Sequence, residues 1–232
     1  MKERLKTLYL GILAGAAIAF GGLLFLFASA FIPADFIIDR KLIGALLFPV
    51  GLLLVCYFKF YLYTGKIGIA FNPGVKKESI NVFEWLLYIL IGNAIGAALI
   101  GIILYLILLP FDGSLLKEAV KAAGESRITP FTFEGIFSMT FKSILCGMLV
   151  YLGILFFNLS NNHFVKVSGI VVTISFFVYA GFQHCVANMF YLTAALLWNI
   201  NSFVGLLLCI VGNSIGALIL NVIAQLAQKA TK

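Results

Sequence analysis

The sequence predicts an all-α integral membrane protein, with six transmembrane helices in an inverted 3+3 repeat that contains two broken helices. The first observation is composition: 62% of the 232 residues are hydrophobic, 11% are charged, and the mean hydropathy is +1.11. About a quarter of the residues of a soluble domain are charged, so this chain has too few charges to cover a water-exposed surface. The second observation is a set of long apolar runs, and the third is a motif that occurs twice.

Six apolar runs are long enough to cross about 30 Å of hydrocarbon, which takes about 20 helical residues. The first run is too long for the hydrophobic region of a cleavable signal, so it is interpreted as a helix. A short surface helix is expected in the hydrophilic connection at 111–134, and shorter breaks lie at 33–41, 72–81 and 158–166. The six predicted spans are at about 8–31, 42–63, 83–110, 135–157, 165–183 and 199–227.

The spans form one predicted membrane domain in two related halves. IGNAIGA at 91–97 recurs as VGNSIGA at 211–217, an offset of 120, and the same offset takes Thr64 in LYTGK to His184 in FQHCV. Each half then holds three spans with a polar interruption late in the second, and an odd number of spans inverts the second half in the membrane. The predicted units are a single domain at 1–232, a first repeat at about 1–110, a second repeat at about 131–232 and a connection at 111–130.

The repeated motif also predicts close helix packing. In both copies, and in GILAG at 11–15, small residues stand four apart, a spacing that lets helix backbones approach closely. Asn93 and Asn213 follow the first glycine of each copy. We expect them to hydrogen-bond between helices or to hold the broken segments in place.

Acidic residues are absent from the predicted membrane interior. All nine Asp and Glu residues lie at or before Glu134, none falls in the middle of a span, and the last 98 residues contain none. Cation channels use acidic rings and proton pumps use membrane-embedded carboxylates, so both classes are excluded. The remaining ionisable groups at membrane depth are Lys59, Lys142 and His184, and a pathway lined by them favours anions. The two lysines are equally well explained as side chains that snorkel to an interface.

His184 is the residue that best fits a functional role inside the membrane. An isolated buried histidine is often a satisfied hydrogen-bonding group, but an ionisable residue inside a membrane is costly and marks function by default. Asn188 lies four residues later on the same helical face, so it is expected to hold one ring nitrogen while the other faces the pathway. A rival is an enzyme with His184 as base and Cys185 as nucleophile. It is disfavoured because adjacent helical residues point about 100° apart.

Charge and cysteine content limit the partners and the location. The chain has 16 Lys and Arg residues and a net charge of +7, but these residues are scattered at segment ends, so a nucleic-acid partner is not expected. Nine fall on the side of both termini and five on the opposite side, which predicts cytoplasmic termini in the plasma membrane. The four cysteines lie in apolar stretches without C-x-x-C spacing, so we expect buried free thiols and no metal site.

Several of these segments resemble the formate/nitrite transporter family. GFQHCVANMF at 181–190 resembles its fifth-helix motif, LYTGK at 62–66 its Ω-loop, and LKTLYLGILAG at 5–15 its first helix. KSILCGMLVYLG at 142–153 resembles its fourth helix, and both GN-x-IGA segments fit, so the resemblance covers nearly the whole chain in order. It implies a homopentamer of aquaporin-like protomers, each with its own pore for a small monovalent weak-acid anion: formate, nitrite, hydrosulfide, acetate or lactate. Passive permeation of this kind needs no cofactor, and no enzymatic activity is expected.

The resemblance also assigns residues by position. It makes Thr64 the Ω-loop threonine, His184 the central histidine and Asn188 its neighbour. The apolar constrictions of the pore would fall on Phe48, Leu52, Leu62, Tyr63, Val150 and Phe177. The basic residues of the vestibules would be Lys6 and, at a second position without a clean match, Lys142 or Arg127.

Three positions depart from the family pattern. The family often has an acidic residue directly before the histidine and another three residues before the threonine, where this chain has Gln183 and Tyr61. Its fourth helix usually has Cys-Asn, where this chain has Cys146 followed by Gly147. These changes alter the hydrogen-bond network that the family builds around its pore, and with it the choice of anion.

The function expected from these residues is passive permeation of a weak-acid anion, with formate first. Basic mouths concentrate the anion, and apolar rings on both sides of His184 and Thr64 make a naked charge costly. Loss of water raises the pKa of a weak acid, which favours passage as the neutral acid or as an anion that shares a proton with His184. A membrane-embedded enzyme and a non-conducting structural subunit are the alternatives.

Overall fold

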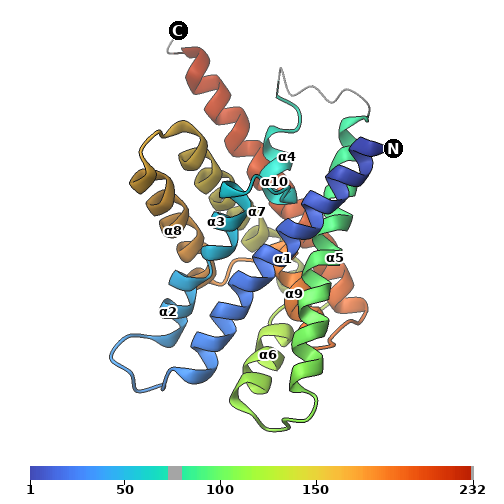
Figure 1. Cartoon of the computed structure of the whole chain (residues 1–232), viewed down its shortest axis with the longest axis vertical. Coiled ribbons are helices and arrows are strands. Elements are labelled where there is room, and N and C mark those ends of the chain that lie inside the picture. The colour runs from blue at the N-terminus through green and yellow to red at the C-terminus, as the bar shows by residue number, and fades with distance from the viewer. Residues whose placement is uncertain (73–79, 231–232) are drawn as a thin grey trace.

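The computed structural model describes residues 1–72 and 80–230, and within them the regular structure is helical, with no β-strand. Six segments are long and apolar enough to span a membrane, namely α1, α2 with α3, α5, α7, α8 and α10, which confirms the predicted all-α fold. The predicted connection at 72–81 falls mainly on residues outside the described ranges. The helices are α1 (Lys2–Phe31), α2 (Arg40–Leu47), α3 (Val50–Tyr57), α4 (Tyr63–Ile69), α5 (Val82–Leu108), α6 (Leu115–Glu125), α7 (Phe133–Leu159), α8 (His163–Ala180), α9 (Cys185–Ala194) and α10 (Ile200–Ala230) (Figure 1).

The second predicted span, 42–63, is interrupted twice. Pro49 lies between α2 and α3, where its missing N–H prevents a continuous helical hydrogen-bond ladder. Lys59, with a φ of 57°, follows the end of α3 and turns the chain into a non-helical stretch before α4 begins. The predicted span therefore ran too far, because its last residues belong to the break itself.

The fifth predicted span, 165–183, also ends early. Gly181 adopts a left-handed conformation with a φ of 74°, and its N–H donates to the carbonyls of Phe177 and Val178, which closes α8 at Ala180. After a short break the chain continues as α9, an apolar helix of 10 residues, all of them buried. A helix of this length is too short to span a membrane, so α9 lies inside the bundle as the second part of a broken helix.

The two halves of the chain repeat one arrangement in opposite orientations. Lys6 near the start of α1 and Asn158 near the end of α7 line the same cavity, so these equivalent helices run in opposite directions. Helix α1 packs on α5, and α7 packs on α10. A Cβ added at Gly15 would lie 2.1 Å from the Asn93 carbonyl oxygen, and one added at Gly147 would lie 2.2 Å from that of Asn213. The predicted close packing through small residues is therefore confirmed in both halves.

Asn93 holds the first break in place. Its Oδ1 accepts the N–H of Tyr63, the first residue of α4, at 2.8 Å. Its Nδ2 donates to the carbonyl oxygens of Gly11 at 2.9 Å and Tyr61 at 2.8 Å. One fully buried amide thus joins α5, α1 and both sides of the break, as the sequence predicted.

Asn213 makes the matching set of bonds in the second half. Its Oδ1 accepts the N–H of Cys185, the first residue of α9, at 2.9 Å. Its Nδ2 donates to the carbonyl oxygens of Ser143 and Gln183, both at 2.8 Å. The same side-chain group, in the same motif, therefore fixes both broken helices.

These bonds correct the register of the repeat at the breaks. Tyr63 and Cys185 occupy equivalent positions, because each begins the helix after its break and each donates to the motif asparagine. The counterpart of His184, the N-cap of α9, is therefore Leu62, the N-cap of α4, and not Thr64. The offset of 120 holds for the third helices but not for the breaks, because the two halves differ in length between these points.

The connection between the halves forms the predicted short helix, α6. Ser114 caps it by accepting the N–H of Lys117 at 3.3 Å. The helix is not confined to the surface, because its apolar face packs on α1 and α9 and covers one end of the bundle (Figure 1). The buried residues of this face are Leu116, Val120, Ala123 and Gly124.

All four cysteines are free, as predicted. Cys146, Cys185 and Cys209 are buried, whereas Cys56 is only part-buried. The Cys209 thiol lies 3.3 Å from the carbonyl oxygen of Gln183, so it adds a weak donor beside the second break.

Candidate functional site

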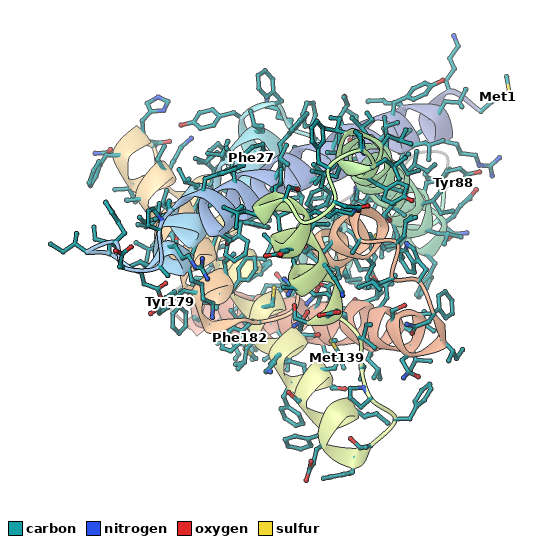
Figure 2. The ribbon with its side chains drawn as sticks, turned by 90° about the horizontal axis from the view of Figure 1, so that it is seen from below. Met1, Phe27, Tyr88, Met139, Tyr179 and Phe182 are labelled. Carbon is teal, nitrogen blue, oxygen red and sulfur yellow. The ribbon has the colours of Figure 1, made fainter. Side chains whose placement is uncertain are left out.

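A basic cavity of about 500 Å³ lies at the end of the bundle that α6 covers, and we call it the α6-side cavity. Figure 2 views the molecule from this end, where Tyr179 and Phe182 mark the end of α8 and the start of the second break. Four basic side chains share the lining with one carboxylate, that of Asp39. Among the polar residues of the lining are Arg40, Lys41, Arg127, Lys142, Gln183, His184 and Asn188.

A second cavity of about 590 Å³ lies at the end that carries the start of α1, and we call it the terminal-side cavity. Its lining contains Lys6, Lys59 and Lys66 and, among the described residues, no carboxylate. The Lys66 ammonium lies 4.8 Å from the centroid of the Tyr61 ring, within range of a cation–π interaction. Both cavities therefore carry a positive charge that attracts anions.

An apolar constriction separates the two cavities. The space at its centre is only about 10 Å³, near the minimum for one water molecule. The rings of Phe48 and Phe177 meet edge to face at 5.8 Å and also line the α6-side cavity, whereas Leu62 also lines the terminal-side cavity. The residues around this centre are Ile18, Phe48, Leu52, Leu62, Val150, Ile174, Phe177 and His184.

Five of the six apolar residues that the resemblance assigned to the constriction lie together at this centre. Tyr63 does not line it. The Tyr63 hydroxyl lies 3.0 Å from the Ser214 hydroxyl, and its backbone N–H is held by Asn93. Tyr63 therefore anchors α4 to α10 and α5.

His184 is the polar group of the constriction. As the N-cap of α9 it accepts the N–H of Ala187 at Nδ1, at 3.2 Å. A ring nitrogen that accepts an N–H carries a lone pair, so the proton of the neutral ring is on Nε2. Nε2 lies 3.0 Å from the Thr64 Oγ1, which is also buried. The histidine thus donates to Thr64, and the hydroxyl hydrogen of Thr64 is left for another acceptor.

The prediction that Asn188 holds a ring nitrogen of His184 is wrong. The Asn188 Nδ2 donates instead to the Oε1 of Gln183 at 3.0 Å and lies 3.7 Å from the Cys209 sulfur. The helical four-residue spacing does not apply, because His184 has extended backbone angles, with φ −111° and ψ 118°. Asn188 does line the α6-side cavity.

The formate/nitrite transporter family model matches residues 2–227. The chain belongs to the formate/nitrite transporter family. Its relatives include the "Uncharacterized transporter YrhG" of Bacillus subtilis, 32% identical over 91% of this chain and 80% of the relative. A "Probable formate transporter" of Methanothermobacter thermautotrophicus is 32% identical over 81% of this chain and 73% of the relative. Because this is a family of transporters, the expectation that the chain is not an enzyme is confirmed.

The fold of this family member agrees with solved structures. A pentameric formate channel with formate bound superposes with a TM-score of 0.83 at 23% identity, over 100% of this chain and 99% of that one. An ion channel of the same family superposes with a TM-score of 0.77 at 23% identity, over 97% and 90% of the two chains. The six-helix fold with its inverted repeat is therefore that of known family structures.

Tyr61 stands where the family often has a carboxylate, and its aromatic ring contacts Trp85 and Lys66. The ring meets Trp85 edge to face at 5.8 Å and receives the Lys66 ammonium on its face. Its N–H donates to the carbonyl of Leu10 at 3.1 Å, which fixes the break against α1. In this chain the partner of Lys66 at this position is therefore an aromatic face.

Gly147 stands where the family usually has an asparagine, and the structure explains why this chain cannot hold one. A Cβ at this position would lie 2.2 Å from the carbonyl oxygen of Asn213, which is backbone within α10. Gly15 has the equivalent close contact with Asn93 in the first half. The glycine is thus a requirement of the crossing between α7 and α10 in this family member.

The structure places the predicted basic residues at the two mouths. Lys6 lines the terminal-side cavity, and both Lys142 and Arg127 line the α6-side cavity. Sequence reasoning missed Arg40 and Lys41 as lining residues, because they stand at the start of a span and were interpreted only as flanking charges. The apolar lining residues Ile18 and Ile174 were missed because nothing distinguishes them from other isoleucines in their helices.

Proposed function

We propose that this protein is a passive channel for small monovalent weak-acid anions, with formate as the first candidate and nitrite, hydrosulfide, acetate or lactate as further ones. The observation that carries the proposal is His184, a polar residue that lines an apolar constriction between two basic cavities and lies within hydrogen-bond distance of the buried Thr64 hydroxyl. A chain without an anion to pass has no use for buried donors at this point, because polar groups in an apolar surrounding are costly.

The histidine acts in this proposal as a neutral donor. Protonation of Nδ1 would put an N–H against the N–H of Ala187 and break the cap of α9. The α9 N-terminus also carries a partial positive charge, which disfavours a cation there. An anion at the constriction would therefore take over the Nε2–H that His184 now donates to Thr64, and the Thr64 hydroxyl would donate to the same anion.

The apolar walls determine the form in which the substrate crosses. A space of about 10 Å³ admits no hydrated ion, so the anion must lose its water at the constriction. Loss of water raises the pKa of a carboxylic acid, and formate would take up a proton and cross as the neutral acid. Transport then needs no cofactor, and its direction follows the gradients of anion and proton.

Assembly and location complete the proposal. We infer a homopentamer, in line with the pentameric formate channel that shares the fold, and one membrane domain at 1–232 with repeats at about 1–110 and 131–232. The start of α1 and the end of α10 lie at the same end of the molecule (Figure 1). The excess of basic residues on that side supports cytoplasmic termini in the plasma membrane.

Formate flux into vesicles tests the proposal. His184→Asn keeps a side chain that can cap α9 but cannot reach Thr64, and Thr64→Val keeps the shape while it removes the hydroxyl. Each should lower flux by about tenfold or more, because the anion that arrives at the constriction loses one hydrogen bond before it takes up a proton. His163→Asn is the matched control, since His163 is the other histidine and is exposed.

Two outcomes would count against the proposal. Flux at the wild-type level in both variants would remove His184 and Thr64 from the pathway. A wild-type protein that assembles in vesicles but passes none of the five anions would favour a non-conducting structural subunit.

A further inference from the structure

Arg127 is held rigidly at the edge of the α6-side cavity. It directly follows the C-cap of α6, and its N–H donates to the carbonyl of Gly124 at 3.0 Å. Its guanidinium carbon lies 4.6 Å from the centroid of the Tyr191 ring, so the planar group is stacked on an aromatic face. Its position is thus set by both its backbone and its side chain.

The guanidinium has no carboxylate partner among the described residues. Nη1 donates to the hydroxyl of Ser126, and Nε is buried without a hydrogen-bond partner. Asp39 lines the same cavity, but its Oδ1 accepts the N–H of Lys41 at 2.8 Å. Nη2 has no hydrogen-bond partner among the described residues and is not covered as Nε is, so the guanidinium keeps a donor that an anion in the cavity can reach.

Two further donors line the same cavity. Lys142 contributes an ammonium group from α7, and Gln183 contributes a side-chain amide from the second break. The Oε1 of Gln183 is occupied by Asn188, which leaves the Nε2 hydrogens of Gln183 as donors. Because Gln183 directly precedes His184, an anion bound here would lie at the entrance to the constriction.

We propose that Arg127, together with Lys142 and Gln183, forms a binding site that selects planar two-oxygen anions at the α6-side mouth. The proposal rests on the anion-channel function and adds a selection step to it. A guanidinium presents two parallel N–H groups that match the two oxygens of a carboxylate or of nitrite. Hydrosulfide and chloride offer one acceptor atom to both N–H groups, so neither hydrogen bond is linear and these ions gain less from a guanidinium than a two-oxygen anion does.

The other basic residues of the cavity do not offer this chemistry. Arg40 is exposed, and water screens its attraction for an anion. The Lys41 ammonium lies 5.4 Å from the centroid of the Tyr179 ring, and a lysine has no pair of parallel N–H groups in one plane. Arg127 is therefore the residue on which selection between anion shapes depends.

Binding of ¹³C-formate to the purified full-length protein tests the site, with the Kd taken from NMR line broadening and chloride used as a competitor. Arg127→Lys keeps the positive charge but removes the pair of parallel N–H groups. It should therefore weaken formate binding about tenfold and leave chloride binding nearly unchanged. Arg4→Lys makes the same exchange at a residue that lines neither cavity and should change neither.

Gln183→Glu is a second, nearly isosteric variant that places a negative charge beside the site, and it should weaken formate binding at neutral pH. Equal loss of formate and chloride in Arg127→Lys, or unchanged formate binding in either Arg127→Lys or Gln183→Glu, would overturn the proposed selection. Formate flux through the wild-type protein, measured in parallel, distinguishes a failure of the proposed selection site from a failure of the proposed channel function. Formate flux with unaltered binding in these variants refutes only the selection site, whereas absent flux refutes the channel.

Discussion

Removal of the motif asparagines is the most direct test of how the broken helices are held. Asn93→Ala deletes three hydrogen bonds of 2.8 to 2.9 Å from one fully buried side chain. Asn213→Ala deletes the equivalent set in the second half. Because the two sites are related by the repeat, the two substitutions should have similar effects.

The magnitude follows from the groups that are left without partners. In Asn93→Ala, the N–H of Tyr63 and the carbonyl of Tyr61 lose their partner, while the carbonyl of Gly11 keeps its bond within α1. Each orphaned backbone group costs about 1–3 kcal/mol, so the free energy of unfolding should fall by about 2–6 kcal/mol. At about 2–4 °C per kcal/mol for a chain of this size, Tm should fall by about 4–24 °C.

The assay is thermal unfolding in detergent at one fixed scan rate. Asn161→Ala is the control, because Asn161 is exposed. Asn93→Asp separates hydrogen bonding from volume, since it keeps the shape but turns an oxygen toward the carbonyls of Gly11 and Tyr61, and it should cost at least as much as Asn93→Ala. A Tm for Asn93→Ala within about 2 °C of the control would refute the assigned role.

Two further predictions concern a close backbone contact and a surface ion pair. Gly147→Asn forces a Cβ to 2.2 Å from the Asn213 carbonyl and should cost at least about 3 kcal/mol, seen as lost folded yield in size-exclusion chromatography. Gly113→Asn, at an open position with a φ of 73° that asparagine tolerates, should keep wild-type yield, and equal yields would contradict the packing argument. The hydrogen bond and charge of Lys117 lower the pKa of Asp112 below its usual 3.8, so the stability that this carboxylate contributes is present above that value. This stability is lost as the pH falls through the lower pKa that Asp112 has in the folded state. The wild-type protein should therefore have a higher Tm than Asp112→Asn above this pKa and the same Tm below it. A Tm difference that does not change with pH would contradict the prediction.

The fold could be predicted from the sequence where the signal was local and repeated. The two GN-x-IGA copies correctly indicated close helix packing, and Asn93 and Asn213 hold the breaks as expected. The short helix α9 escaped prediction because 10 buried apolar residues resemble part of a span. Hydropathy measures how apolar a segment is and does not distinguish a helix that crosses the membrane from one that ends inside the bundle.

The site could be predicted only in part, because its geometry depends on the ends of helices. The offset of 120 paired Thr64 with His184, and the two side chains do touch, although they are not equivalent in the repeat. They meet because α4 and α9 both begin at the centre from opposite sides. Asn188 was misassigned because helical spacing was applied from His184, a residue that stands before the helix. Such errors concern one residue at a helix start, where periodicity carries no information.

The repeat itself explains how a symmetric framework can carry an asymmetric chemistry. The asparagines fix both breaks in the same way, so the two N-cap positions face the same point from opposite sides. One N-cap residue is Leu62, whose side chain cannot accept a hydrogen bond from the first turn of α4. The other is His184, whose ring accepts such a bond from the first turn of α9. The constriction is therefore lined at this point by an apolar side chain from the first half and by a hydrogen-bonding imidazole from the second half. Exchange of these two residues, as Leu62→His with His184→Leu, would move the donor to the opposite half while the asparagine framework stayed intact.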